Sequence, residues 1–216
     1  MGKISKGILG AFSGKVGTVV GATWRSIAYM RSLPAKVKNP RTEKQLAQRT
    51  KFALVSLFFK PILSLLNTGW KFSGGKRTPF NAAMSHALNN AVTGAYPDWE
   101  LDHSKILISS GTLYGVENGM VGYTASPRTL NFAWDANMGV GDAKWDDDTI
   151  IAVVNPAKND AIQAVGTTTR TQGICSLPVH FSWIGDTVYV YLGFISKDGK
   201  HVSNSSFLGA IEITAS

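Results

Sequence analysis

The 216-residue chain has one cysteine, Cys175, which excludes an internal disulfide and a zinc site built from four cysteines. It also has no long apolar run. The most apolar stretch, residues 52–66, is shorter than the roughly 20 residues that span a bilayer, and it contains Lys60 and Pro61. Glycines, a serine and Lys15 interrupt the apolar residues that an N-terminal secretory signal would need. We therefore expect a soluble chain with no signal peptide and no transmembrane segment.

Acidic residues are almost absent from the first third of the chain. Residues 1–77 carry 15 Lys/Arg and one acidic residue, Glu43, a net charge of +14, whereas residues 78–216 carry 7 basic and 13 acidic residues, a net charge of −6. This division predicts that the first part faces a polyanion, an acidic partner or another copy of the chain. The candidate contact residues are Lys15, Arg25, Arg31, Lys36, Lys38, Arg41, Lys44, Arg49 and Lys51.

Residues 8–33 alternate small, polar and apolar side chains, and their valines and aromatic residues favour extended structure. We predict a glycine-rich hairpin or pair of strands. Its glycines permit tight turns or the close approach of another backbone, which suits an arm that packs into an assembly. Ordinary turn chemistry is the alternative explanation.

Two helices are predicted next. Thr42 and Gln45 have the spacing of a capping box, so a helix should begin there and run to about Asn67, kinked or split at Pro61. The pair Thr78-Pro79 predicts the N-terminus of a second helix, antiparallel to the first and ending before residue 94. The first helix carries an apolar stripe that predicts either core packing or a subunit contact. The predicted subunit contacts are Trp24, Tyr29, Phe52, Val55, Phe59, Ile62 and Leu66.

From about residue 103 the pattern changes to the period of two that is typical of half-buried strands. Residues 150–154 form a continuous apolar run, which predicts a more fully buried strand. About seven strands are expected, among them residues 105–109, 150–154 and 208–214 and the alternating segments around 130–134, 177–183 and 188–194, with a hairpin turn at Asp198-Gly199.

The fold class is therefore α+β. A β-arm and a helical hairpin in residues 1–97 precede a β-sandwich of immunoglobulin or fibronectin type III character in residues 98–216. The boundary is placed near Tyr96-Pro97, and the missing cysteine pair argues against an antibody-type domain.

No catalytic constellation is apparent, and we predict a non-enzymatic protein with no cofactor and no metal. The pairs Gly14-Lys15 and Gly75-Lys76 lack the spacing of a phosphate-binding loop, and the four histidines lack metal-ligand spacing. The triplet at residues 146–148 is interpreted as a solvated acidic turn rather than a cation site. Cys175 is in phase with Leu177 and Val179, so it is expected on their apolar face.

The run GKVGTVVGATW…YMRSLPAKVKNPRTEKQLAQRTKFALV resembles a family of uncharacterised proteins from Bacteroidetes-type bacteria and their phages. The resemblance covers about residues 1–75, and the remainder only in architecture. It implies a phage or prophage setting, in which the chain would be a component of a virion or particle. The expected location is then the virion or the bacterial cytoplasm.

These observations support three hypotheses. The first is a structural or assembly protein that forms a homo-oligomer or binds other particle proteins through residues 1–95. The second is a nucleic-acid-binding protein without sequence preference that uses the basic segment, since no base-reading motif is present. The third is a hydrolase or carbohydrate-binding sandwich, which rests on fold analogy alone.

Overall fold

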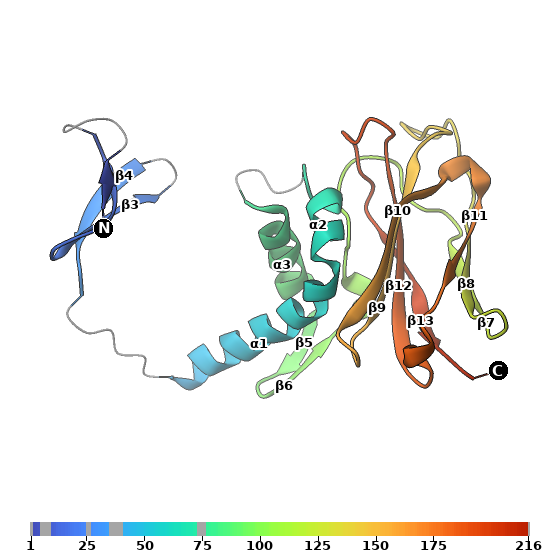
Figure 1. Ribbon diagram of the computed structural model, residues 1–216, viewed down its shortest axis with the longest axis horizontal. Helices are drawn as coiled ribbons and strands as arrows, with labels where there is room; N and C mark the ends of the chain where they lie inside the picture. The colour runs from blue at the N-terminus through green and yellow to red at the C-terminus, as the bar shows by residue number, and fades with distance from the viewer. Residues whose placement is uncertain (1, 5–9, 25–26, 35–40, 73–76, 216) are drawn as a thin grey trace. The chain divides into compact units, whose positions relative to one another are not determined.

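The computed structural model describes residues 2–4, 10–24, 27–34, 41–72 and 77–215 (Figure 1). The contacts divide the chain into two units, Met1–Thr42 and Glu43–Ser216. Each unit is described by itself.

The first unit is a four-stranded antiparallel sheet in the order β1-β2-β3-β4. Its strands are β1 (Lys3–Ile4), β2 (Phe12–Val16), β3 (Val19–Trp24) and β4 (Ile27–Ser32). A two-residue turn joins β2 to β3, and Gly17 in this turn has a φ of +57°, which favours glycine. The predicted hairpin is therefore present, and two further strands extend it.

The second unit begins with helices: α1 (Glu43–Phe59), a 3-10 turn (Lys60–Ile62), α2 (Leu63–Gly69) and α3 (Pro79–Asn90). Pro61 lacks a backbone N–H and cannot continue α1, so the predicted split at this residue is confirmed. The Oγ1 of Thr78 accepts a hydrogen bond of 3.3 Å from the backbone N–H of Asn81. The predicted N-cap of the second helix is confirmed as well.

The stretch Glu43–Gly69 is long and apolar enough, by length and composition, to cross a membrane. This is a weak indication, because core helices of water-soluble proteins pass the same test. Val55, Phe59 and Leu66 of this stretch are fully buried within the chain itself. One side of the stretch therefore packs in the core of the chain.

A short hairpin and two larger sheets follow the helices. The hairpin pairs β5 (Val92–Ala95) with β6 (Asp98–Leu101), and the larger sheets have the orders β10-β9-β12-β13 and β11-β8-β7. Their strands are β7 (Met120–Thr124), β8 (Thr129–Ala133), β9 (Asp148–Asn155), β10 (Asp160–Thr169), β11 (Ile174–Pro178), β12 (Thr187–Ile195) and β13 (Ser206–Glu212). All pairs of strands in these sheets are antiparallel.

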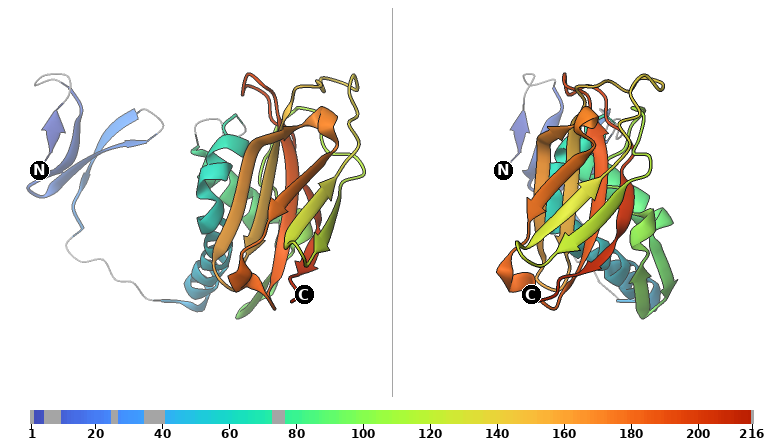
Figure 2. Two further views of the ribbon diagram at one scale, coloured as in Figure 1. Left: turned by 45° about the vertical axis from the view of Figure 1, so that its right-hand side comes forward. Right: turned by 90° about the vertical axis from the view of Figure 1, so that its right-hand side faces the viewer.

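The four-stranded sheet is the middle layer of the second unit, with the helices on one side and the three-stranded sheet on the other (Figure 2). In β9, Ile150, Ala152 and Val154 face the helices. Ile151 and Val153 face the three-stranded sheet. Because both faces of β9 are covered, its sequence is a continuous apolar run, and the predicted buried strand is confirmed. The mixture of helices and antiparallel sheets is an α+β fold.

The division after Thr42 differs from the boundary expected near residue 97. Tyr96-Pro97 forms the turn of the β5–β6 hairpin rather than a linker. The helices also share one core with the middle sheet, in which the Phe58 ring lies 6.3 Å from the Tyr191 ring between centroids. Residues 43–97 therefore belong with the sheets that follow them.

Two segments predicted as strands have other conformations. In the segment predicted over residues 105–109, Lys105 ends a 3-10 turn (His103–Lys105). The backbone N–H of Ile108 donates to the Ser205 Oγ at 2.9 Å instead of to a neighbouring strand. The strand predicted over residues 177–183 ends at Pro178, and Phe181–Trp183 is a 3-10 turn. Ile106, Ile108 and Trp183 are buried although they lie outside the strands, whereas Phe181 is exposed.

Candidate interaction surfaces

The register of the N-terminal sheet sorts its side chains onto two faces, because paired residues of neighbouring antiparallel strands project to the same side. Alternate residues of each strand also share a face. One face, which we call the basic–aromatic face, carries the rows Lys15–Val20–Arg31, Ala22–Tyr29 and Trp24–Ile27.

The basic–aromatic face presents its rings and cations to solvent. Trp24 is 61% exposed and Tyr29 is 45% exposed, and together with Ile27 they line a shallow depression. Lys15 and Arg31 are exposed on either side of Val20. The face therefore offers an aromatic end beside a cationic end.

The opposite face, which we call the uncharged face, carries no Lys, Arg, Asp or Glu among its described residues. Its rows are Ile4–Phe12, Val16–Val19–Ser32, Gly14–Gly21–Met30 and Thr23–Ala28. The Phe12 ring lies over Gly21, where an added Cβ would come within 2.7 Å of it. Gly21 is the one buried residue among those described in this unit. Ile4, Val16 and Met30 are more than half exposed.

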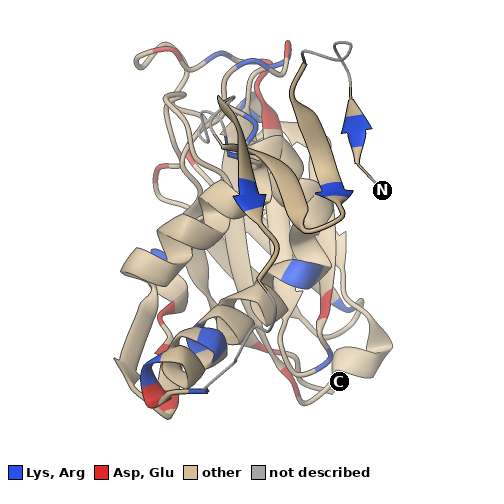
Figure 3. Cartoon of the chain, turned by 90° about the vertical axis from the view of Figure 1, so that its left-hand side faces the viewer, with Lys and Arg blue, Asp and Glu red and all other residues tan. Residues whose placement is uncertain are grey.

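The net positive charge of the chain lies entirely in this first unit. Residues 1–42 contain eight Lys/Arg and no Asp or Glu, whereas residues 43–216 contain fourteen of each sign. Figure 3 shows acidic residues on strands and loops of the second unit and at the start of α1. The first unit therefore has no internal carboxylate to neutralise its cations.

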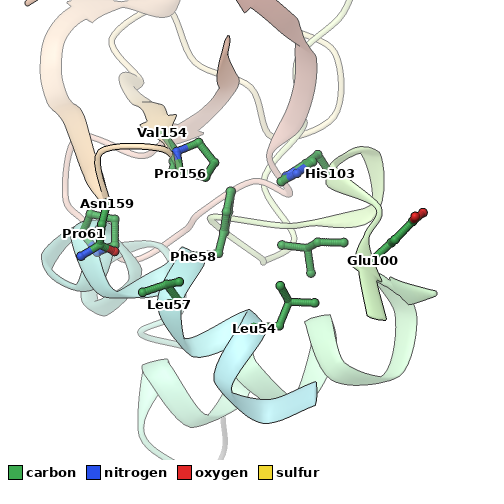
Figure 4. A pocket seen from close by; sticks show the side chains of 10 residues that line it. Leu54, Leu57, Phe58, Pro61, Glu100, His103, Val154, Pro156 and Asn159 are labelled. Atoms are coloured by element: carbon green, nitrogen blue, oxygen red, sulfur yellow. The ribbon is translucent and has the colours of Figure 1, made fainter. Parts of the chain in front are cut away.

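The second unit contains an apolar pocket of about 250 Å³ (Figure 4). Side chains of α1, of β6 and of the turn after β9 surround it. They are Leu54, Leu57, Phe58, Pro61, Glu100, Leu101, His103, Val154, Pro156 and Asn159. Its volume is slightly below the range of sites for drug-sized ligands, and it fits one apolar side chain or a small molecule.

His103 at the edge of this pocket is held by ring packing. Its ring stacks on the Tyr189 ring with centroids 3.5 Å apart, and it lies 5.1 Å from the Phe58 ring. Burial lowers the pKa of His103 to about 4, and the nearby Asp102 opposes this shift. At neutral pH the imidazole is therefore uncharged and serves as a packing group.

A fully buried ion pair joins Asp147 to Arg170, with 3.0 Å between Oδ2 and Nε. The guanidinium also donates to the carbonyl oxygen of Tyr114 at 2.8 Å and to the Oδ1 of Asn137 at 2.6 Å. It lies 3.9 Å from the centroid of the Phe194 ring. Burial lowers the pKa of Arg170, and the attraction of Asp147 opposes this. Through these contacts the pair holds the loop that contains Tyr114 and the loop that contains Asn137.

The sequence did not reveal this ion pair, because the partners are 23 residues apart. The triplet at residues 146–148 was expected to be a solvated turn, but Asp147 is buried and Asp148 binds the exposed Lys197 at 3.2 Å. The solvated interpretation is therefore wrong for Asp147. Among the described residues, no group of three or more His, Cys, Asp or Glu gathers as metal ligands would.

A family model described as "Family of unknown function (DUF6266)" matches residues 11–209. The chain belongs to this family. The match includes strands β2 to β4 of the N-terminal sheet and most of the second unit, so the family pattern covers parts of both units. A search among curated proteins finds no match.

In this DUF6266 member, the predicted basic residues belong to different units. Lys15 and Arg31 share the basic–aromatic face, whereas Arg25, Lys36 and Lys38 lie outside the described residues. Lys51 of α1 places its Nζ 5.6 Å from the centroid of the Trp99 ring. The remaining predicted cations lie at the start of α1 or just before it: Arg41, Lys44 and Arg49.

The predicted subunit contacts separate into two groups. Trp24, Tyr29 and Phe52 are exposed. The other four are fully buried in the chain's own core, where they hold the helices on the middle sheet, so they are not available for a subunit contact: Val55, Phe59, Ile62 and Leu66. Apolar residues at helical spacing give the same sequence pattern whether they pack in the chain's own core or against another subunit.

Cys175 lies on β11 in the core between the two large sheets, as its phase with Leu177 predicts. Burial raises the pKa of its thiol, and a hydrogen bond with Thr168 opposes this. A thiol with a raised pKa is a poor nucleophile at neutral pH. Cys175 therefore has the environment of a packed core residue.

Proposed function

We propose that this protein is a non-enzymatic assembly protein that associates with further copies of itself through its N-terminal sheet. The observation that carries the proposal is the uncharged face, on which Ile4, Val16 and Met30 are exposed. A small sheet with almost no buried side chain lacks the apolar burial that stabilises independent sheets. Covering this face would supply that burial.

A second copy is the occupant that the charge pattern favours. The uncharged face has no group that repels its own copy, while the cations identified by register project from the other face. Two sheets can stack face to face about 10 Å apart with their interiors apolar. Such stacking would leave both sets of cations in solvent. An acidic partner would instead be drawn to the cationic side.

The second unit is proposed to be a display domain of immunoglobulin or fibronectin type III character. Its strands β7 to β13, taken as first to seventh, group as 1-2-5 and 4-3-6-7. The constant-type immunoglobulin domain groups its seven strands as 1-2-5-4 and 3-6-7. Moving the fourth strand to the other sheet gives the grouping seen here, which supports the assignment.

The particle in which the protein assembles is proposed to be a phage virion or a phage-derived particle, with the bacterial cytoplasm as its site of synthesis. This part rests on the resemblance of residues 1–75 to proteins of Bacteroidetes-type bacteria and their phages. Purified particles from a producing strain should contain the protein in stoichiometric amount by mass spectrometry. Its absence from such particles would remove the particle setting but not the self-association.

Sedimentation velocity over a concentration series tests the self-association with two matched variants on β4. Met30→Glu places a charge on the uncharged face, and Ile27→Glu places the same charge on the opposite face. Both wild-type side chains are more than 60% exposed. We expect Met30→Glu to raise the dissociation constant at least about 10-fold, with little effect of Ile27→Glu. A wild-type chain that stays monomeric at every concentration would contradict the proposal.

A further inference from the structure

The basic–aromatic face combines two kinds of side chain that are useful together for one class of ligand. Its rows are two residues apart along the strands, which is about 7 Å. Moving along the face, the row with Lys15 and Arg31 is followed by Tyr29 and then by Trp24. The cationic row is thus followed along the strands by two rows that each carry one aromatic ring.

From this arrangement we propose that the basic–aromatic face binds single-stranded nucleic acid without sequence preference. Lys15 and Arg31 would contact phosphate oxygens, which supply most of the affinity in non-specific binding. Tyr29 and Trp24 would stack on successive bases, because every base offers an aromatic face. Ile27 beside Trp24 extends the apolar surface on which a base lies.

The geometry favours a single strand over a duplex. Bases in a duplex are stacked on one another, so exposed rings on an open sheet can stack only on bases that are unpaired. The described part of the first unit contains strands and no helix that would enter a major groove. The same surface therefore has little to contact on double-stranded DNA beyond phosphates.

The positive charge of the first unit also favours binding of nucleic acid. Residues 1–42 contain no carboxylate that would repel phosphates. An acidic peptide would also be attracted to Lys15 and Arg31, but it has no planar base to place on Trp24 and Tyr29. The exposed rings therefore favour nucleic acid, and an acidic peptide is an alternative that the experiment separates.

This activity goes beyond the proposed self-association and uses the opposite face of the sheet. Copies paired through their uncharged faces would present two basic–aromatic faces, one on each side of the pair. Either property can fail without the other, because the variants that test them lie on different faces.

Fluorescence anisotropy of the full chain with a labelled oligo(dT) of ~20 nucleotides tests the proposal. We expect binding that weakens steeply between about 50 and 200 mM salt, and a several-fold weaker response to a duplex of equal length. Trp24→Ala and Tyr29→Ala should each weaken binding by about 10-fold, which corresponds to the loss of one stacked base. Lys15→Ala and Arg31→Ala should each lower the slope of log affinity against log salt by about one.

Two controls separate stacking from damage to the sheet. Tyr29→Phe keeps the ring and should bind within about two-fold of wild type. Met30→Ala removes an exposed side chain from the uncharged face and should leave affinity for oligo(dT) unchanged under conditions where the chain is monomeric. If Tyr29→Phe lost binding as fully as Tyr29→Ala, stacking would not be the mechanism.

Three results would overturn the proposal. The first is no binding of oligo(dT) at low salt. The second is equal binding of polyglutamate, with no effect of Trp24→Ala on either ligand, which would identify an acidic-peptide surface. The third is an equal loss of affinity in Met30→Ala and Trp24→Ala, which would place the effect in the fold of the sheet.

Discussion

The two units of the chain differ in how much of their apolar surface the chain itself covers. In the second unit, both faces of the middle sheet are buried, one under helices and the other under a second sheet. In the first unit, Gly21 is the one buried residue among those described, although both faces of the sheet carry apolar side chains. The second unit therefore has the core of an independent domain. The first leaves nearly all of its described apolar side chains at least partly exposed.

Charge follows the same division. The second unit has equal numbers of acidic and basic residues, and its buried Arg170 is matched by Asp147. The first unit has cations and no carboxylate. A balanced unit can remain separate, whereas an unbalanced unit attracts a partner of opposite charge. We propose that the second unit supplies stability and that the first supplies interaction, and the following variants test this proposal.

The largest expected effect is the loss of a core side chain from α1. Phe59→Ala should lower the free energy of unfolding of the second unit by about 3 to 5 kcal/mol, because Phe59 is fully buried. Phe52→Ala, on the same helix but half exposed, should cost less than about 1 kcal/mol. Urea denaturation followed by circular dichroism measures both. Equal costs would contradict the division of α1 into a core side and an exposed side.

The next effect concerns the buried ion pair. Asp147→Asn should destabilise the second unit by about 3 kcal/mol or more, because it leaves the buried Arg170 without a counter-charge. Asp148→Asn, which removes only the partner of the exposed Lys197, should cost less than about 1 kcal/mol. Thermal denaturation of the two variants makes the comparison. Neither change should alter self-association. If the variants lost association in parallel with stability, self-association would depend on the second unit as well.

A smaller effect should appear as pH falls. The folded chain holds His103 neutral down to a pKa of about 4, whereas the unfolded chain takes up the proton near 6.5. Between these values the unfolded state binds more protons, so the free energy of unfolding falls as pH falls. His103→Phe keeps a ring on Tyr189 and should remove about 1 to 2 kcal/mol of this dependence, a value reduced because the histidine is partly exposed.

Urea denaturation of wild type and His103→Phe at pH 7 and pH 4.5 tests this prediction. His86 also has a pKa lowered by burial, but it is present in both chains and cancels in the comparison. Parallel losses of stability in the two chains would show that His103 titrates normally in the folded state.

The smallest expected effect on stability is that of the N-terminal sheet. Met30→Glu should change the free energy of unfolding of the second unit by less than about 0.5 kcal/mol. The two hydrophobic cores of the second unit are built from residues within 43–216, and Met30 lies outside them. The same variant is expected to weaken self-association. If it lowered the denaturation midpoint of the second unit, the two units would share stabilising contacts.

Local signals in the sequence predicted the helices and the most buried strand. Pro61 and Thr78 act on the backbone next to them, and the apolar run of β9 reflects burial on both faces, so neighbouring residues suffice. The function of Pro97 was not predictable in the same way, because a proline in a hairpin turn and a proline in a linker give the same pattern. The position of the boundary after Thr42 depends on which elements share a core.

The candidate surface was predicted in part. The excess of cations and the aromatic residues Trp24 and Tyr29 were visible in the sequence, but their exposure and the register that places Lys15 and Arg31 on the same face were not. The stripe that includes Phe59 is apolar whether a helix packs on its own sheet or on another subunit. The pairing of Asp147 with Arg170 depends on loops that only the folded chain brings together.

The central claim is that residues 1–42 carry self-association while residues 43–216 fold without them. Sedimentation equilibrium of the full chain and of residues 43–216, at matched concentrations, tests it most directly. We predict that the average mass of the full chain rises with concentration, while the shorter chain stays monomeric with an unchanged denaturation midpoint. A shorter chain that associates as strongly as the full chain would contradict the claim.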